Sequence, residues 1–183
     1  MKTIMKTIEI KDFTHAVYPM HTHLLTSIDE NGKTNIITID WLTVLSRNPP
    51  LVGVAVSPKR YTHKLIMSSK EFIINVPDIS MADETLACGT LSGKNIDKFK
   101  KLGLKKSPSK TLKTHIIKGC IAFVECKVID FKKYGDHTFF IGSIQASYAK
   151  GGFLKEFKPI LHVKGSIFTT TSGKIIKAKS SQS

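Results

Sequence analysis

The stretch 49–63 constrains the fold of this chain more than any other. Two prolines open it, an apolar run rich in β-branched residues follows at Leu51–Val56, and a polar turn comes next at 57–62. A short apolar run bounded by such residues predicts a buried strand. Apolar residues then recur at helical spacing, which predicts a helix with Thr62 as its N-cap.

A strand that ends in this turn can direct several donors at one anion. Arg60 carries a planar guanidinium suited to phosphate, and Ser57 and Thr62 carry short hydroxyl side chains. The start of the following helix adds backbone N–H groups. The alternative is an ordinary strand–turn–helix, in which Thr62 only caps and Arg60 is solvated.

Further strands are expected on both sides of this stretch. Asn31-Gly32 favours positive φ and predicts a hairpin turn, and residues 40–46 connect this hairpin to the prolines. Two long strands in the second half are expected to be joined by a five-residue turn at 132–136. The expected strands are 24–28, 34–39, 51–56, 72–76, 121–131 and 137–149.

Few helices are expected between these strands. Ser80 to Asp83 has the spacing of a capping box, so a helix should begin there and run toward Gly89. A short helix is expected at 96–102, ended by Gly103. Strands with turns at short spacing predict a mainly β, antiparallel barrel. The chain has neither a G-x-G-x-x-G sequence nor a Walker loop, so a Rossmann or P-loop nucleotide site is not expected.

Length and composition predict one domain over residues 1–183, with a core at about 15–165 and a basic C-terminal tail. The N-terminus lacks the apolar segment of a secretory signal, and no apolar run is long enough to span a membrane. Cys88, Cys120 and Cys126 form an odd set without C-x-x-C spacing, which favours reduced thiols in the cytoplasm.

The formal net charge of +14 attracts anions without specifying which. Nine lysines and a single acid, Asp97, lie between Lys94 and Lys118. Phe99 is the only aromatic residue there, and its spacing places it in the core. A single-strand nucleic-acid site would interleave aromatic residues with cations. The segment is therefore interpreted as solvated surface, and nucleic-acid binding is not expected.

Six short motifs occur in a fixed order. They are Gly32-Lys33-x-Asn35-x-x-Thr38-x-x-Trp41, Asn48-Pro49-Pro50-Leu51-Val52, Ser57-Pro58-x-Arg60-Tyr61-Thr62-His63, Phe72-x-x-Asn75-Val76-Pro77, Ser92-Gly93-x-x-x-Asp97-Lys98-Phe99 and Gly135-Asp136-His137-x-x-x-x-Gly142. Together they resemble the flavin reductase-like family, and flavoredoxins within it, over about residues 15–165.

The resemblance implies a split β-barrel of antiparallel, Greek-key type that binds FMN at the interface of a homodimer. It also implies electron transfer from NADH or NADPH to a flavin or to another acceptor, such as a ferric chelate. Matched to these motifs, the residues expected to bind the cofactor are Asn35, Thr38, Ile39, Asp40, Trp41, Thr43, Ser57, Pro58, Arg60, Tyr61, Thr62, His63, Asn75, Ser92 and Gly93.

The chemistry of these residues suits parts of FMN. Trp41 can form a wall for the flavin ring or be an ordinary core aromatic residue. His63 can donate to the phosphate or face solvent. His137 opens a strand after a Gly-Asp turn and is the candidate catalytic residue. It can orient nicotinamide, stabilise anionic reduced flavin or donate a proton; the alternative is a surface histidine.

His21-Thr22-His23 departs from the apolar strand usual in the family. Residues two apart share a strand face, so two imidazoles there can share a metal. A third ligand is not evident nearby, and a role at the strand surface or an interface is favoured. No metal site is predicted.

Three functions remain open at this point. The favoured one is an NAD(P)H-dependent flavin or electron-acceptor reductase. A non-catalytic FMN electron carrier of the same fold is the first alternative. A basic β-barrel that binds nucleic acid is the second.

Overall fold

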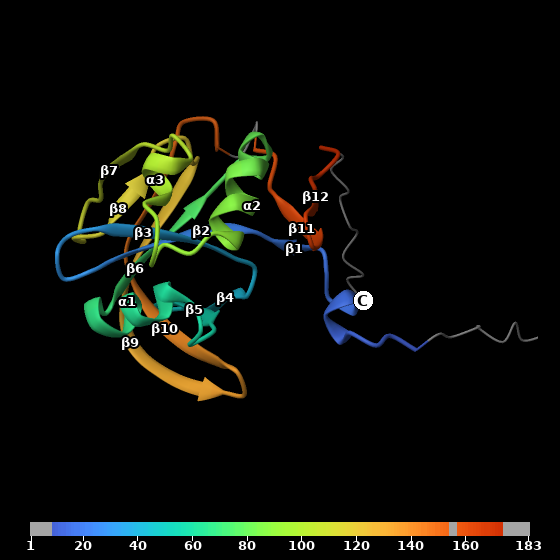
Figure 1. Ribbon diagram of the computed structural model, residues 1–183, viewed down its shortest axis with the longest axis horizontal. Helices are drawn as coiled ribbons and strands as arrows, with labels where there is room; N and C mark the ends of the chain where they lie inside the picture. The colour runs from blue at the N-terminus through green and yellow to red at the C-terminus, as the bar shows by residue number, and fades with distance from the viewer. Residues whose placement is uncertain (1–8, 154–156, 174–183) are drawn as a thin grey trace, which may run out of the picture.

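The protein is described by a computed structural model covering residues 9–153 and 157–173 (Figure 1). The predicted basic tail and the N-terminal residues 1–8 lie outside this range. The elements are η1 (Phe13–Ala16), β1 (Met20–His21), β2 (His23–Ile28), β3 (Thr34–Ile39), β4 (Leu42–Arg47), β5 (Pro50–Val56), α1 (Tyr61–Ser69), β6 (Glu71–Val76), η2 (Ile79–Met81), α2 (Ala82–Thr90), α3 (Lys98–Lys101), β7 (Lys106–Pro108), β8 (His115–Ile117), β9 (Ala122–Tyr134), β10 (His137–Ala149), β11 (Leu161–Lys164) and β12 (Ile167–Thr169).

The main sheet has the strand order β3-β2-β6-β9-β10-β5-β4, with every neighbouring pair antiparallel. Its two edge strands, β3 and β4, are joined by Asp40 and Trp41 alone. Such a short connection brings the two edges together, so the sheet must curl round on itself. The Ala55 N–H donates to the Trp41 carbonyl at 2.9 Å, which extends the pairing of β4 with β5 into this connection. The predicted antiparallel barrel is thus confirmed.

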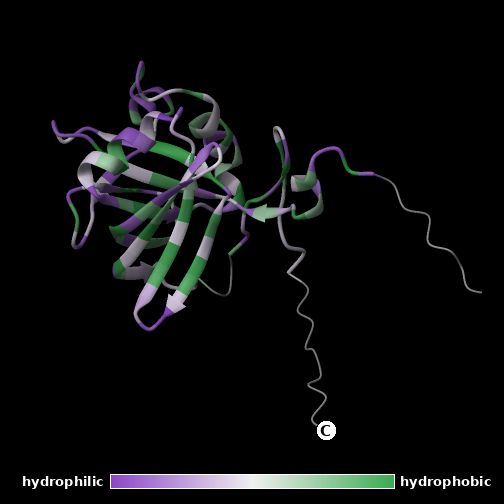
Figure 2. Cartoon of the chain, turned by 90° about the horizontal axis from the view of Figure 1, so that it is seen from below, coloured by the Kyte–Doolittle hydropathy of each residue, from purple (hydrophilic) through white to green (hydrophobic). Residues whose placement is uncertain are grey.

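Helices lie on two sides of strands β2 and β3, with α1 on one side and α2 and α3 on the other (Figure 1). Side-chain alternation follows from the strand period of two. Leu25 and Ile37 enter the core shared with α1, whereas Leu24 and Ile36 enter the core with Phe99 of the segment around α3. Both faces of these strands are therefore buried. Figure 2 shows the hydrophilic residues concentrated in the connecting loops.

Two small sheets complete the fold. Strands β7 and β8 form one beside α3, and strands β1, β11 and β12 form the other. In Figure 1 the three-stranded sheet lies at the side of the barrel, beside α2. Strand β11 of this sheet places His162 next to Asp40, which lies at the seam between β3 and β4. Among the described residues, no helix is long and apolar enough to cross a membrane.

Two buried carboxylates hold the loop between β7 and β8. Glu125 accepts hydrogen bonds from the N–H groups of Lys110 and Thr111, each at 2.7 Å, and from two hydroxyls. Glu71 accepts from both the N–H and the hydroxyl of Thr114, each at 2.7 Å. Because a buried charge without partners is costly, these bonds fix the loop to the barrel wall.

Several sequence predictions need correction. Residues 42–47 form the edge strand β4 and not a simple connection, because they pair with β5. The predicted five-residue turn is a two-residue turn, since β9 continues to Tyr134 and pairs with His137. Gly135 has φ of 57°, a conformation that suits glycine.

The predicted helix starts also shift. Arg60 and not Thr62 is the N-cap of α1, and it makes no side-chain capping bond. Ser80 lies inside η2, whose cap is Asp78, so the expected capping box does not form. Asp97 caps α3, which is shorter than predicted. In each case a neighbouring residue in extended conformation supplies the cap position.

Candidate functional site

Three adjoining cavities lie where the barrel seam meets the ends of α1 and α2. The seam cavity, about 190 Å³, is bordered by the 37–41 and 55–57 segments, Tyr18 and His137. The turn cavity, about 110 Å³, lies between the start of α1 and the 89–93 segment. The arm cavity, about 230 Å³, lies between α2 and the β11–β12 hairpin. Arg60 borders all three.

Arg60 is positioned by the end of α2. Its guanidinium donates from Nη1 to the carbonyl of Gly89 at 3.2 Å, while the side chain remains exposed. Gly89 itself packs closely on β3, where an added Cβ would lie 3.2 Å from the Thr38 Cβ. Arg60 is therefore exposed to solvent but held at one end by α2, and its role at a phosphate stays a prediction. One bond to a carbonyl leaves most of its five donor hydrogens available.

The seam cavity combines an aromatic wall with a histidine. The Trp41 and His137 rings lie with their centroids 4.5 Å apart. Trp41 is 38% exposed, so it is not the ordinary core residue that the sequence left open. His137 Nδ1 lies 2.8 Å from a carboxylate oxygen of Asp136, and this hydrogen bond lowers the pKa of Asp136. The bond assigns the Nδ1 proton and leaves Nε2 for another contact.

The turn cavity is built for close approach to the backbone. The α1 N-terminus has no side-chain cap, so no capping side chain accepts hydrogen bonds from the first N–H groups of the helix. Asn35 donates from Nδ2 to the Thr62 hydroxyl at 2.8 Å. A Cβ at Gly93 would lie 1.8 Å from Asn35 Oδ1, so only glycine fits there. The cavity is bordered by Asn35, Ile37, Lys59, Arg60, Tyr61, Thr62, Gly89, Thr90, Leu91, Ser92, Gly93 and Lys98, with no carboxylate among them.

Lys98 makes the turn cavity electrostatically unusual. Its side chain is only 5% exposed, and Nζ donates to the carbonyls of Ile36 at 2.7 Å and Cys88 at 2.6 Å. Burial lowers its pKa to about 8, and the nearby charge of Arg60 adds to this effect. Among the described residues, no carboxylate forms an ion pair with Lys98. A buried ammonium beside a guanidinium favours an anion in this cavity.

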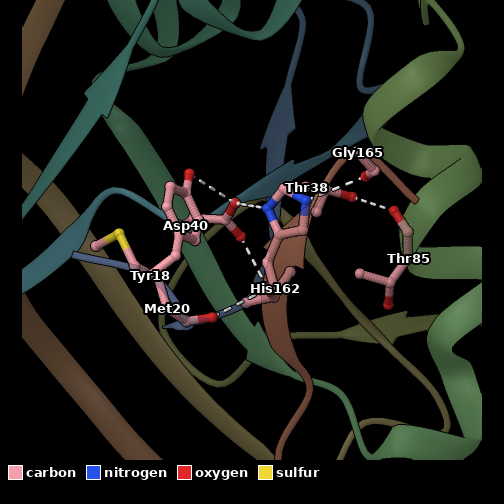
Figure 3. A network of polar contacts seen from close by, with 8 residues as sticks. Tyr18, Met20, Thr38, Asp40, Thr85, His162 and Gly165 are labelled. Atoms are coloured by element: carbon pink, nitrogen blue, oxygen red, sulfur yellow. Dashed lines mark hydrogen bonds and ion pairs between the residues drawn. The ribbon is translucent and has the colours of Figure 1, made fainter. Parts of the chain in front are cut away.

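Asp40 anchors the small sheet of β1, β11 and β12 to the seam between β3 and β4 (Figure 3). Its carboxylate accepts from the Thr22 hydroxyl at 2.8 Å and lies 2.6 Å from His162 Nδ1 and 3.5 Å from the Tyr18 hydroxyl. His162 Nε2 lies 3.1 Å from the Gly165 carbonyl. Both ring nitrogens of His162 thus face oxygen atoms. The Asp40 carboxylate is therefore occupied within the protein.

The structure brings most of the predicted site residues to the cavities. Those bordering one or more cavities are Asn35, Thr38, Ile39, Asp40, Trp41, Ser57, Arg60, Tyr61, Thr62, Ser92, Gly93 and His137.

Four predicted residues do not border any of them. Asn75 is fully buried and donates to β2 and β6, while its Oδ1 accepts from the Ile117 N–H. His63 is half-buried, contacts the Thr138 hydroxyl through Nε2 and packs on Phe140, and it borders none of the three cavities. Thr43 is exposed on β4, and Pro58 lies in the turn without bordering a cavity.

Sequence reasoning missed several residues that border the cavities. Lys98 lay within a quoted motif, but its place in a lysine-rich segment indicated solvated surface. Tyr18, His162 and Phe168 come from segments distant in sequence and carried no local signal. The missed residues that border the cavities include Tyr18, Lys59, Gly89, Thr90, Lys98, His162 and Phe168.

The two neighbouring histidines are placed differently from the prediction. The His21 and His23 rings lie 4.1 Å apart, and His23 is only 7% exposed, so a surface role for it is wrong. Burial lowers the pKa of His23 to about 3 and also lowers that of His21. Among the described residues, no group of three or more potential ligands could hold a metal ion.

Comparison with known proteins identifies similar chains. The family model described as flavin reductase like domain matches residues 15–171. An uncharacterised protein of Pyrococcus abyssi is 41% identical over 169 residues, 89% of this chain and 96% of the relative. A flavin reductase of Pseudomonas putida is 29% identical over 129 residues, 70% of this chain and 72% of the relative.

Solved structures with the same fold extend the comparison. The flavoredoxin of Methanosarcina acetivorans is 27% identical, with a TM-score of 0.84 over 98% of this chain and 97% of that chain. An FMN-binding protein from Thermus thermophilus is 24% identical, with a TM-score of 0.84 over 97% of this chain and 100% of that chain. The second likeness concerns the fold alone.

Proposed function

This chain belongs to the flavin reductase-like domain family, and from that premise we propose that it binds FMN and is an NAD(P)H-dependent reductase of flavin or another electron acceptor. A ferric chelate is one such acceptor. The observation that carries the proposal is the turn cavity, where Arg60 and buried Lys98 meet with no carboxylate. Membership of the family supports a flavin-related role, and the cavity supports a phosphorylated flavin.

The turn cavity fits a terminal phosphate. At about 110 Å³ it has room for a small anion, and it is bordered by the start of α1 and by hydroxyl side chains. Arg60 supplies a bidentate donor, Lys98 a buried charge, and Gly93 the space for close backbone approach. These groups would hold the phosphate of FMN.

The seam cavity suits the flavin ring. When bound, FMN would supply a hydride acceptor and a site for electron transfer. Trp41 would provide an aromatic wall, and the backbone at 38–41 would meet the polar edge of the ring. His137, oriented by Asp136, would use Nε2 to orient nicotinamide, stabilise negative charge or donate a proton.

We further propose a homodimer with the flavin at its interface. The β4 edge of the main sheet exposes Val44 at 68% and Leu45 at 43%, next to Trp41. Phe131 and Ile129 on β9 are also exposed. Apolar groups on an unpaired strand edge are typical of surfaces that a partner covers. Light scattering tests this point, and a monomer that binds a full equivalent of flavin would contradict it.

The cytoplasm is the proposed location. Cys88, Cys120 and Cys126 are all buried and free of disulfides. Burial raises the pKa of Cys88 to about 11 and that of the other two to about 12, so these thiols resist oxidation. Free thiols suit a reducing compartment.

A non-catalytic FMN electron carrier is the second candidate. The likeness to a flavoredoxin above 25% identity favours it specifically. Turnover of NADH or NADPH with added flavin or ferric chelate separates the two candidates. A reductase shows continuous oxidation of the nicotinamide, whereas a carrier shows at most a single reduction of its bound flavin.

The experiment that tests the cofactor is the absorption spectrum of the purified protein, followed by identification of the flavin released on heating. We expect FMN, or FMN uptake in preference to FAD. Tight FAD binding without FMN uptake, or a colourless protein that takes up no flavin, would overturn the proposal.

A further inference from the structure

In the part of the chain that the structure describes, the lysines and arginines have no carboxylate partner within ion-pair distance. The sequence holds 28 lysines and arginines against 14 acids. In the described part of the chain, all three ion pairs involve a histidine, and no lysine or arginine pairs with a carboxylate. The positive field is therefore not neutralised locally, and it extends from the surface into solvent.

Part of this charge gathers on one surface, here called the lysine face. Backbone pairing brings it together: Lys118 N–H donates to the Lys105 carbonyl at 2.8 Å, and Lys106 pairs with Ile117 across β7 and β8. The acid in this segment, Asp97, accepts from the Lys100 N–H as the cap of α3. The lysine face consists of Lys94, Lys100, Lys101, Lys105, Lys106 and Lys118, all exposed and with no side-chain hydrogen bond or ion pair to any other described residue.

The lysine face adjoins the turn cavity. Lys94 directly follows Gly93, and Lys100 and Lys101 share the short helix α3 with Lys98. Figure 1 shows α3, β7 and β8 gathered at one end of the molecule. A macromolecule held on this surface would therefore lie against the edge of the proposed cofactor site.

The composition of the face favours an acidic protein over a nucleic acid. It contains lysines alone; Arg47 and Arg60, the two arginines of the sequence, lie elsewhere. Lysine is a compact, hydrated point charge without the planar fork that recognises phosphates bidentately. Phe99 is 7% exposed and the His115 ring is half-buried and bonded to the Thr34 hydroxyl, so the segment offers no exposed ring on which bases could stack. Charges of this kind steer transient protein encounters more than they add affinity.

We propose that the lysine face docks a small acidic electron-carrier protein, the macromolecular redox partner of the flavin site. This inference rests on the proposed function for the role of the partner. Docking itself depends only on charge and includes no redox step. It can therefore be measured with both proteins oxidised and with any flavin content.

The test uses a plant-type [2Fe–2S] ferredoxin of strongly negative charge as the probe, with binding measured by calorimetry. The variant Lys100→Glu/Lys101→Glu/Lys105→Glu reverses three charges on the face. The matched control Lys64→Glu/Lys127→Glu/Lys133→Glu makes the same change in net charge at exposed positions elsewhere. We expect the first variant to bind at least about tenfold more weakly than the wild type, and the control less than about threefold.

Three further measurements sharpen the result. Wild-type binding should vanish between about 0.01 M and about 1 M salt, as the Debye length falls from about 30 Å to about 3 Å. Carbodiimide should link the ferredoxin carboxylates to lysines of the face. A basic c-type cytochrome should not bind.

Each opposite result is decisive. Equal losses in the two triple variants, or none in either, would overturn the proposal. Duplex DNA bound as tightly as ferredoxin at the same salt would replace it with general polyanion binding. A colourless protein that still docks ferredoxin through the face would refute the flavin function and leave the docking surface intact.

Discussion

Two buried polar regions of this protein differ in one respect. The carboxylate clamp, formed by Glu71 and Glu125 with the loop at 109–115, has donors from the protein for both buried charges. The cation pocket, formed by buried Lys98 and exposed Arg60 at the turn cavity, has no carboxylate partner among the described residues. Both regions lie at the barrel wall, and both order a segment of chain.

The difference separates structure from function. A buried charge whose partners are all internal lowers the free energy of the folded state without any ligand. A buried charge without a counterion raises the free energy of the folded state. An anionic ligand that pairs with this charge removes the cost, and this gain adds to the affinity for the ligand. The comparison predicts that changes in the clamp affect stability, whereas changes in the pocket affect affinity for FMN.

The largest effect is expected from Glu125→Ala. It leaves two backbone N–H groups and the Tyr148 hydroxyl without their acceptor in a buried setting. Each buried donor left without its acceptor costs about 1–3 kcal/mol, so the unfolding free energy should fall by roughly 3–5 kcal/mol. Urea denaturation measures this loss. FMN affinity of the folded fraction should remain unchanged, and a selective loss of FMN affinity at full stability would break the comparison.

The next effect concerns Arg60. Arg60→Ala removes a charge-assisted contact with the phosphate worth about 1.5–3 kcal/mol, which is roughly 10- to 150-fold in FMN affinity. The side chain is exposed, so the unfolding free energy of the apoprotein should hardly change. Fluorescence titration with FMN measures the affinity.

Riboflavin provides the control for Arg60, because it has the same ring without the phosphate. Its affinity should be nearly equal in the wild type and in Arg60→Ala. Arg60→Lys should recover only part of the FMN affinity, because an ammonium cannot reproduce the fork. Equal losses for FMN and riboflavin would assign Arg60 a structural role.

The sequence predicted these two regions unequally. Arg60, Asn35 and Trp41 were found because each sits in a short motif next to a turn, where local chemistry is informative. Lys98 was missed because burial of one lysine among nine depends on where α3 packs. The clamp was not predicted at all, since Glu125 and Thr111 meet only through the folded barrel.

The fold follows the same division. The hairpin at Asn31-Gly32 and the long strand 137–149 were predicted because turn residues and β-branched runs act locally. Strand β4 was read as a connection, although it forms a short hairpin with β5, because the register shift between Val44 and Ser46 interrupts the alternation of side chains that marks a strand. Asn75 was assigned to the cofactor from its motif, yet all its bonds serve the barrel wall.

The dependence of folding stability on acid pH is the third prediction, and it concerns buried His23. The folded-state pKa of His23 is about 3, because burial favours the neutral ring, against 6.5 for an ordinary histidine. The unfolded chain therefore takes up a proton first as the pH falls. Stability should be complete above about pH 6.5 and decline by up to about 1.4 kcal/mol for each pH unit below it, down to about 3.

The carboxylate clamp should respond at lower pH. Hydrogen bonds to Thr111, the Lys110 N–H and Tyr148 lower the pKa of Glu125 despite its burial. Its contribution is present above the ordinary pKa of 4.5 and lost only below it. Thermal melts of the wild type and of His23→Gln between pH 7 and pH 5 separate the contribution of His23 from that of Glu125. The melting temperature of each protein is compared with its own value at pH 7. An identical decline in both proteins would remove His23 as the cause.

The smallest effect is expected from the pH dependence of FMN binding, and it tests Lys98 directly. In the free protein its pKa is about 8, lowered by burial and by the charge of Arg60. A phosphate in the turn cavity would favour the charged ammonium and raise that pKa, so binding above pH 8 must take up a proton. FMN affinity should thus fall several-fold, and at most about tenfold, from pH 8 to pH 9.

Lys98→Arg keeps its charge over this range and should bind FMN with little pH dependence. Lys98→Met should bind more weakly at every pH and likewise without this slope. A slope that persists in both variants would place the titrating group elsewhere, and the cation pocket would then reduce to Arg60 alone.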